Sequence, residues 1–200
     1  IDLDEYYFND NENFILYGGR FHRVKGIEYL IEAFSNITRH SKVNLVLVGE
    51  GPEEAKLKKI VEEKKMGSRI TILPFLNKNQ FRAYLSNCKV FVLPSLYETF
   101  GIVVIEAMAS SKPVIVSNIP GPDDIIINEY NGFLVEKENV LDLEKNLLRC
   151  LSDESLCQEM GKNARRTVKD KYTFEIVSKE YINLYLSILK NRHVVGFYER

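Results

Sequence analysis

The sequence predicts an α/β protein: a Rossmann-like, doubly wound parallel sheet with helices on both faces and a helical carboxy-terminal segment. Three observations support this fold class. Apolar strand-like runs alternate with helix-like stretches as far as residue 135, which is the pattern of successive β-α-β units. The run VFVLP at 90–94 is apolar throughout, as expected of a parallel strand buried on both faces. Beyond residue 135, the chain reads as helix almost to its end.

The individual elements follow from the same alternation. Strands are expected at 14–17, 43–48, 70–73, 90–93, 113–116 and 133–135. Helices are expected near 26–38, 53–66, 78–87, 101–110 and 123–128. Ligands of open α/β sheets bind where strands end and helices begin. We therefore expect a site in the loops at the carboxyl ends of these strands.

The last third of the chain is expected to be helical, with breaks near Ser152–Asp153 and near Gly161. It carries a stripe of mostly apolar side chains at roughly helical spacing, made of Tyr172, Ile176, Tyr181, Tyr185 and Ile188. We expect this stripe to pack on the sheet domain as core. Residues 191–200 are expected to form a tail, as a helix extension, a sheet-edge contact or a disordered end.

Composition indicates a globular protein and excludes some classes of partner. Its hydrophobic fraction of 45% and charged fraction of 28% are ordinary for a soluble domain. A net charge of −1 gives no reason to expect nucleic acid or an anionic membrane as the main partner. The cysteines Cys88, Cys150 and Cys157 have no C-x-x-C spacing, and we expect reduced thiols in a cytoplasmic protein. No apolar run reaches transmembrane length and no signal peptide is visible.

The first site loop is GGRFHRVKG at 18–26, after the first strand. Gly18 and Gly19 allow a tight turn, and Arg20 and Lys25 place two cations at the start of the next helix. Backbone amides at a helix N-terminus add partial positive charge, so the loop suits a diphosphate. It matches neither the Walker A loop nor G-x-G-x-x-G. The alternative is that these are surface cations around a turn.

The second loop, VGEGP at 48–52, joins a strand to the next helix. Its glycines and proline are explained by the turn alone. A role for the backbone of 49–51 in facing a ligand is the alternative.

The third segment runs from Glu98, at the mouth of a helix, to Glu106 inside that helix. Glu106 is flanked by Ile105 and Ala107, and a buried carboxylate in apolar surroundings needs a partner. Hydroxyl-rich ligands, such as the ribose and hexose of a sugar nucleotide, are suitable partners. One alternative is that other groups of the protein form the hydrogen bonds that the Glu106 carboxylate needs. Another is that Glu98 caps the amino end of the helix. Free amides at residues 100–102 are positioned to point at a phosphate or a sugar hydroxyl.

Taken together, these segments resemble the carboxy-terminal half of retaining glycosyltransferases of the GT-B fold, family 4 (glycosyl transferases group 1). The resemblance runs from Ile1 to about residue 190. It is carried in order by GGRF…KG at 18–26, VGEGP at 48–52, VFVLPSLYETFGIVVIEAMASSKPVIVS at 90–117 and NGFLV at 131–135. Residues 1–12 then resemble the linker from an amino-terminal domain that this chain lacks, and 13–190 the donor-binding domain.

The resemblance also implies roles for the site residues. Arg20 and Lys25 are expected to bind the diphosphate of a nucleotide sugar, Glu106 the ribose hydroxyls, and Glu98 the transferred sugar. The base is expected near 75–76. The full donor-binding set expected on this basis is Gly19, Arg20, Lys25, Leu76, Glu98, Phe100, Gly101, Ile102 and Glu106, with Arg20, Lys25 and Glu98 acting in catalysis. No cofactor and no metal are expected, because two cations and helix amides face the diphosphate.

The sequence departs from the family pattern at several positions. Where many members carry Gly-Gly and then Glu, this chain has Pro120, Gly121, Pro122, Asp123 and Asp124. Ser111 replaces a frequent glycine, Lys89 a frequent aspartate and Pro74 another glycine. These departures affect the expected base pocket and the loop at 118–124. They leave unchanged the four side chains to which the resemblance gives roles, Arg20, Lys25, Glu98 and Glu106.

The leading hypothesis is therefore the donor-binding domain of a glycosyltransferase that moves a hexosyl group from a UDP-, GDP- or ADP-linked sugar to a glycan or a lipid-linked acceptor. The acceptor is expected to bind an amino-terminal domain, with possible peripheral association of the longer protein with the cytoplasmic membrane face. Two alternatives stay open. One is a non-catalytic nucleotide-sugar-binding subunit. The other is a different GT-B activity, as an inverting transferase, phosphorylase or epimerase.

Overall fold

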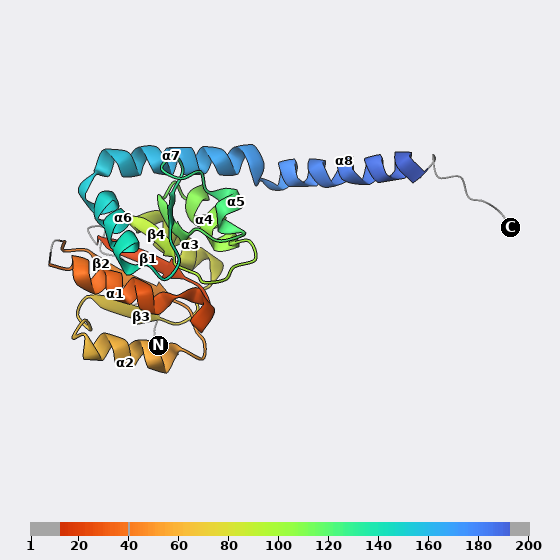
Figure 1. Ribbon diagram of the computed structural model, residues 1–200. Coiled ribbons are helices and arrows are strands. Elements are labelled where there is room, and N and C mark those ends of the chain that lie inside the picture. The colour runs from red at the N-terminus through yellow and green to blue at the C-terminus, as the bar shows by residue number, and fades with distance from the viewer. Residues whose placement is uncertain (1–12, 40, 193–200) are drawn as a thin grey trace.

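The computed structural model describes residues 13–39 and 41–192, with side chains up to residue 189. The expected linker at 1–12 and most of the expected tail lie outside the described residues. At the centre is a sheet of six parallel strands (Figure 1). The strands are β1 (Phe14–Gly18), β2 (Asn44–Val48), β3 (Ile70–Leu73), β4 (Val90–Leu93), β5 (Val114–Ser117) and β6 (Phe133–Val135).

The strand order is β3-β2-β1-β4-β5-β6, and every pair is parallel. The chain starts in the middle of the sheet, winds outward to β3, returns to β4 beside β1, and winds outward again to β6. This is the predicted doubly wound fold. The order reverses between β1 and β4, and such a switch point opens a crevice at the carboxyl ends of the two strands.

Helices on both faces cover the sheet, as predicted. They are α1 (Ile27–Ile37), α2 (Glu54–Glu63), α3 (Lys78–Asn87), α4 (Ile102–Ala109), α5 (Pro122–Ile125), α6 (Val140–Ser152), α7 (Glu154–Lys171) and α8 (Phe174–Arg192), with a 3-10 turn, η2 (Arg23–Lys25). Helix α1 packs against α2 and α6, while α4 packs against α3 and α7. All five residues of β1 and all four of β4 are buried, because helices lie on each side of these strands.

The break expected at Ser152–Asp153 is confirmed, and the one expected at Gly161 is wrong. Helix α6 ends at Ser152, and the Asp153 carboxylate caps α7 by accepting a hydrogen bond from the Leu156 amide at 2.9 Å. Helix α7 runs through Gly161 without interruption. There, a Cβ would lie 2.1 Å from the Ser111 carbonyl oxygen. Gly161 therefore permits close packing of α7 on the end of α4, which a sequence cannot distinguish from a helix break.

The stripe of side chains on the last helix was expected to pack on the sheet domain as part of the core. This expectation is wrong for most of the stripe. Tyr172 packs against the core, but α8 extends away from the sheet domain (Figure 1). Tyr181 and Tyr185 are 56% and 61% exposed, and Ile182 and Leu184 on the same helix are exposed too. Helical spacing predicts an apolar face but says nothing of what covers it. Among the described residues, no helix is both long and apolar enough to cross a membrane.

The exposure of α8 predicts that its aromatic side chains contribute little to domain stability. Replacing Tyr181 and Tyr185 together by serine should change the free energy of unfolding by no more than about 0.5 kcal/mol per site. The control is Phe91→Ala in the fully buried β4, which should cost about 3–5 kcal/mol. Urea unfolding measures both. A loss in the double variant as large as that of Phe91→Ala would contradict the exposed position of α8.

Candidate functional site

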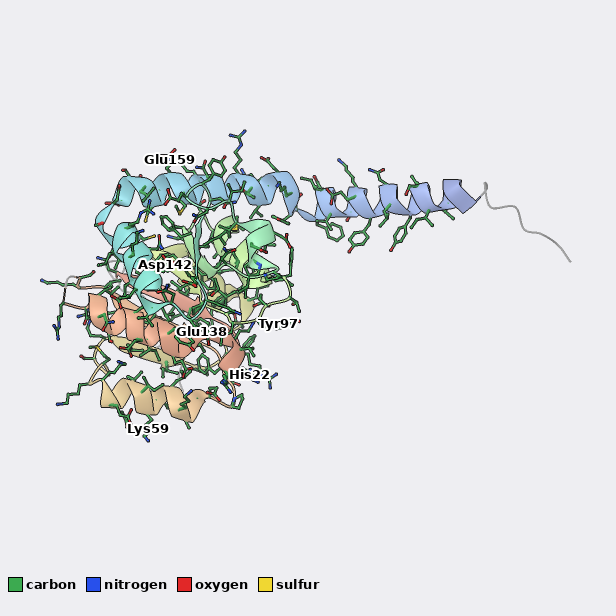
Figure 2. All side chains as sticks on the ribbon, viewed as in Figure 1. His22, Lys59, Tyr97, Glu138, Asp142 and Glu159 are labelled. Carbon is green, nitrogen blue, oxygen red and sulfur yellow. The ribbon has the colours of Figure 1, made fainter. Side chains whose placement is uncertain are left out.

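A cavity of about 1100 Å³ lies at the carboxyl ends of the central strands, beside the switch point. Its walls come from the loops after β1, β2, β3 and β4 and from α3, α4 and α7. The lining includes Gly19, Arg20, Lys25, Gly49, Glu50, Phe75, Leu76, Lys78, Phe81, Arg82, Glu98, Val103, Glu106, Ser110 and Arg165. Its volume is slightly above the usual range for small-molecule sites. The loops after β1 and β4 carry the labelled residues His22 and Tyr97 (Figure 2) and meet where the Tyr97 amide donates a hydrogen bond to the Val24 carbonyl oxygen at 3.3 Å.

Six of the nine predicted donor-binding residues line this cavity together: Gly19, Arg20, Lys25, Leu76, Glu98 and Glu106. Three do not line it. Phe100 packs edge-on against Tyr172, with ring centroids 6.0 Å apart. Gly101 is the buried N-cap of α4, and Ile102 begins the helix with its side chain 68% exposed. Any role of these three rests on their backbone amides and stays a prediction.

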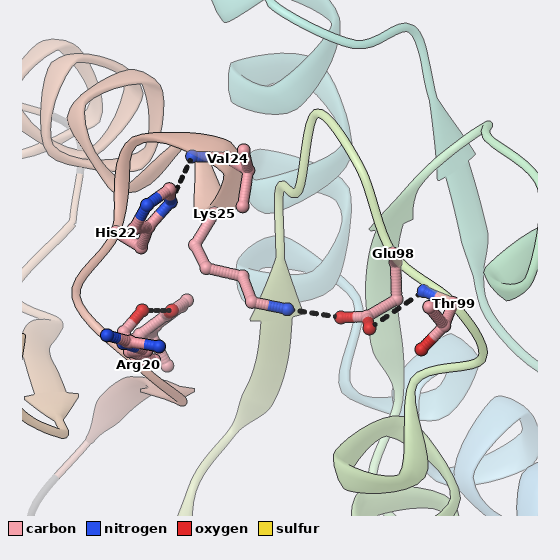
Figure 3. A network of polar contacts seen from close by, with 7 residues as sticks. Arg20, His22, Val24, Lys25, Glu98 and Thr99 are labelled. Atoms are coloured by element: carbon pink, nitrogen blue, oxygen red, sulfur yellow. Dashed lines mark hydrogen bonds and ion pairs between the residues drawn. The ribbon is translucent and has the colours of Figure 1, made fainter.

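An ion pair joins the first and third site loops (Figure 3). The Lys25 Nζ lies 2.6 Å from the Glu98 Oε2, although 73 residues separate them. The other oxygen, Glu98 Oε1, accepts a hydrogen bond from the Thr99 amide at 3.1 Å. A backbone hydrogen bond of 2.7 Å from the Leu96 amide to the Val24 carbonyl holds the two loops together. Glu98 is therefore tied to the opposite loop, and it is not a helix cap.

Gly26 permits the two loops to come this close. It has φ +61°, and a Cβ there would lie 2.1 Å from the Pro94 carbonyl oxygen. The site geometry thus depends on the absence of a side chain at this position.

Gly26→Ala is accordingly expected to cost about 1–3 kcal/mol of stability, through the left-handed backbone and the clash with Pro94. The matched control is Gly67→Ala, because a Cβ at Gly67 meets nothing within 4 Å. Chemical denaturation of the two variants provides the measurement. Equal stability of both would mean that the loops do not pack as described.

Tyr17 fixes the backbone that carries Arg20. Its hydroxyl donates a hydrogen bond to the Arg20 carbonyl oxygen at 3.1 Å. Burial raises the pKa of Tyr17 far above its usual value, and the nearby charge of Glu98 raises it further. The phenol therefore stays a neutral donor. A Cβ at Gly49 would lie 1.9 Å from the Gly19 carbonyl oxygen, so close packing of the two turns explains that glycine without a ligand.

Burial of Glu106 was expected, and this expectation is wrong. The residue is exposed, yet it lines the cavity on the same face of α4 as Val103 and Ser110. The buried face of the helix carries Val104, Ala107 and Met108 instead. Sequence neighbours lie about 100° apart around a helix, so apolar flanking residues do not report burial. Among the described residues, no hydrogen bond or ion pair involves the Glu106 carboxylate.

Sequence reasoning missed several cavity residues. Lys78, Arg82 and Ser86 line the cavity from one face of α3, and their spacing of four was a readable signal. Arg165 reaches the cavity from α7, and no local motif marks it. Asp123 and Asp124 are exposed in α5 and do not line the cavity. No three His, Cys, Asp or Glu side chains of the described part of the chain come together as metal ligands.

Comparison with known proteins identifies the family. Residues 2–167 match the model of the family "Glycosyl transferases group 1". The chain belongs to this family. Among its relatives is an uncharacterized glycosyltransferase of Methanocaldococcus jannaschii, 35% identical over 88% of this chain and 45% of the relative. The chain thus spans less than half the length of that relative.

Solved structures agree with this assignment. Sucrose-phosphate synthase from Thermosynechococcus elongatus aligns with a TM-score of 0.84 and 31% identity, over 94% of this chain and 48% of the synthase. A mutant of Staphylococcus aureus TarM, solved in complex with fondaparinux, α-GlcNAc-glycerol and UDP, aligns with a TM-score of 0.81 and 28% identity, over 90% and 36% of the two chains. The prediction of a glycosyltransferase domain, one Rossmann-like half of a GT-B fold, is confirmed.

Proposed function

We propose that this chain is the donor-binding half of a retaining glycosyltransferase that transfers a hexosyl group from a nucleotide-diphosphate sugar to a glycan or a lipid-linked acceptor. One observation carries the proposal: the Arg20, Lys25, Glu98 and Glu106 side chains converge on one cavity at the switch point of the sheet. The presence of UDP in the TarM structure supports the nucleotide class.

The diphosphate is assigned to Arg20 and Lys25. No hydrogen bond or ion pair of the Arg20 guanidinium is found among the described residues, so all five of its donors are available. Lys25 gives one of its three N–H groups to Glu98 and keeps two for phosphate oxygens. Negative charge builds on the diphosphate as the glycosidic bond breaks. Cations already held there stabilise the transition state more than the ground state.

The ribose and the transferred sugar are assigned to the two glutamates. The Glu106 carboxylate faces the cavity without a partner among the described residues, which suits a pair of ribose hydroxyls. A carboxylate has about four lone-pair sites, so Glu98 can hold Lys25 and the Thr99 amide and still accept from a sugar hydroxyl. The base is assigned to the wall formed by Phe75 and Leu76.

Retention is proposed to follow a same-face path through an oxocarbenium-like state, as the family resemblance implies. Glu98 orients the sugar and does not attack it, because the ion pair with Lys25 and the hydrogen bond from the Thr99 amide make its carboxylate a weaker nucleophile. The α-GlcNAc-glycerol in the TarM structure supports an α product.

The acceptor is assigned to a part of the protein that this chain does not include. In a GT-B enzyme, the two halves enclose the reacting substrates between them. The chain spans less than half the length of the relatives described above. We therefore expect the isolated chain to bind donor and to transfer poorly. Its free thiols are consistent with the cytoplasmic location we propose. Robust turnover by the chain alone would contradict this part of the proposal.

A thermal-shift panel of UDP-, GDP- and ADP-sugars tests the proposal directly. A ligand at 100 times its dissociation constant should stabilise the chain by about 2.7 kcal/mol. The matched control is Lys59→Ala, because Lys59 is exposed on α2 (Figure 2) and does not line the cavity. It should keep the shift that Lys25→Ala reduces. No stabilisation by any of these sugar nucleotides would overturn the assignment.

A further inference from the structure

Two cysteines meet at the junction of α6 and α7. Cys150 lies in the last turn of α6, and Cys157 lies in the first turn of α7. The Cys157 Sγ donates a hydrogen bond to the Cys150 carbonyl oxygen at 3.0 Å, and both cysteines line the same small cavity. A connection of one residue between the helices brings them together.

A small cavity of about 130 Å³ opens on this pair. It lies at the opposite edge of the sheet from the candidate donor site, because Val43 and Lys89, which precede β2 and β4, line it together with Ser41, Glu154 and the two cysteines. A water molecule takes about 30 Å³ of liquid, so the cavity has room for a molecule as small as hydrogen peroxide. Cys157 is half-buried and Cys150 is buried, which makes Cys157 the thiol that is reached first.

The surroundings favour the thiolate of Cys157. The neighbouring Cys150 thiol lowers the pKa of Cys157 most, and the charge of Lys89 lowers it further, against the effects of burial, Asp153 and Glu154. The amino end of α7 adds partial positive charge. Cys88 is the contrast within the same chain: it is 1% exposed, and burial raises its pKa to about 12.

We propose that Cys157 and Cys150 are a peroxide-reactive thiol pair that closes reversibly into an intramolecular disulfide. The Cys157 thiolate attacks one oxygen of hydrogen peroxide, the O–O bond breaks, and the departing hydroxide takes a proton to become water. The resulting Cys157 sulfenic acid is attacked by the Cys150 sulfur. The S–S bond forms, the S–O bond breaks, and the hydroxyl leaves as a second water with the Cys150 proton. The two sulfurs supply the two electrons that peroxide accepts.

The test treats the full 200-residue chain with hydrogen peroxide, quenches it, and counts thiols after denaturation. Of the three free thiols, one should remain, and the intact mass should fall by two hydrogen atoms. Dithiothreitol should restore all three. Peptide mapping should join Cys150 to Cys157 and leave Cys88 reduced.

Variants separate the roles of the two sulfurs. Cys150→Ser should stop at the sulfenic acid, which dimedone traps on Cys157. Cys157→Ser should keep its other thiols under the same treatment, and Cys88→Ser should still close the disulfide. Retention of all three thiols in the wild-type chain, oxidation of Cys157 to sulfinic acid with Cys150 still free, or a disulfide that includes Cys88 would each overturn the proposal.

Discussion

Replacing Arg20 and Lys25 together by alanine should weaken binding of a nucleoside diphosphate by about a hundredfold or more. Both side chains line the cavity. Hydrogen bonds to charged groups contribute about 1.5–3 kcal/mol each, and about 1.4 kcal/mol corresponds to a factor of ten. Isothermal titration calorimetry on the wild-type and variant chains measures the loss.

The single variants should rank in a definite order. The Arg20 guanidinium has no hydrogen-bond or ion-pair partner among the described residues, whereas the Lys25 ammonium is already paired with Glu98. Arg20→Ala should therefore cost more affinity than Lys25→Ala. Lys59→Ala, the charge-matched control outside the cavity, should bind as the wild type does. An unchanged affinity of the double variant for the nucleoside diphosphate would contradict the assignment of the diphosphate to Arg20 and Lys25.

In an enzyme that joins this domain to the proposed acceptor domain, the same double variant should lose more rate than affinity. The cations face charge that develops only as the glycosidic bond breaks. Loss of one such donor typically lowers kcat by about 10²–10³. A fall in kcat no larger than the fall in nucleotide affinity would mean that the two cations bind the donor without assisting the reaction.

Glu98→Gln should have the second large effect, and a more selective one. Glutamine keeps the shape of the side chain but loses the charge that pairs with Lys25 at 2.6 Å. Lys25 then turns fully to the diphosphate, so binding of the nucleoside diphosphate should be retained or strengthened. The advantage of the nucleotide sugar over the nucleoside diphosphate should fall by about tenfold, because a charged acceptor for a sugar hydroxyl is lost.

The measured quantity is the ratio of the two dissociation constants in each variant. Thr99→Ala is the matched control, because Thr99 binds Glu98 through its backbone amide, and that amide survives the substitution. If this ratio of dissociation constants is the same in Glu98→Gln as in the wild type, Glu98 does not contact the transferred sugar and serves only the structure of its loop.

The sequence predicted the sheet closely because its strands are buried on both faces. The run at 90–93 could be read as a strand without knowledge of its neighbours, and β4 has those bounds. The loops after β1 and β4 were identified for the same reason, since parallel strands place their carboxyl ends at one edge. What the sequence lacked was the contact between the loops, which brings Lys25 to Glu98 across the sheet.

Other features could not be predicted from local patterns. The exposure of Glu106 depends on which face of α4 meets the sheet, and its immediate neighbours do not encode that. Arg165 reaches the cavity only because α7 packs on α4 through Gly161. The stripe of α8 has the spacing of a core helix, yet nothing in its own sequence specifies a covering surface.

The most direct test of the binding site compares two nucleotides on two chains. The nucleoside diphosphate that binds best and its 2′,3′-dideoxy analogue are titrated by calorimetry into the wild type and Glu106→Gln. The wild type should prefer the hydroxylated nucleotide by about tenfold or more, and Glu106→Gln should lose most of that preference. An equal preference in both chains, or none in the wild type, would contradict the assignment of the ribose to Glu106.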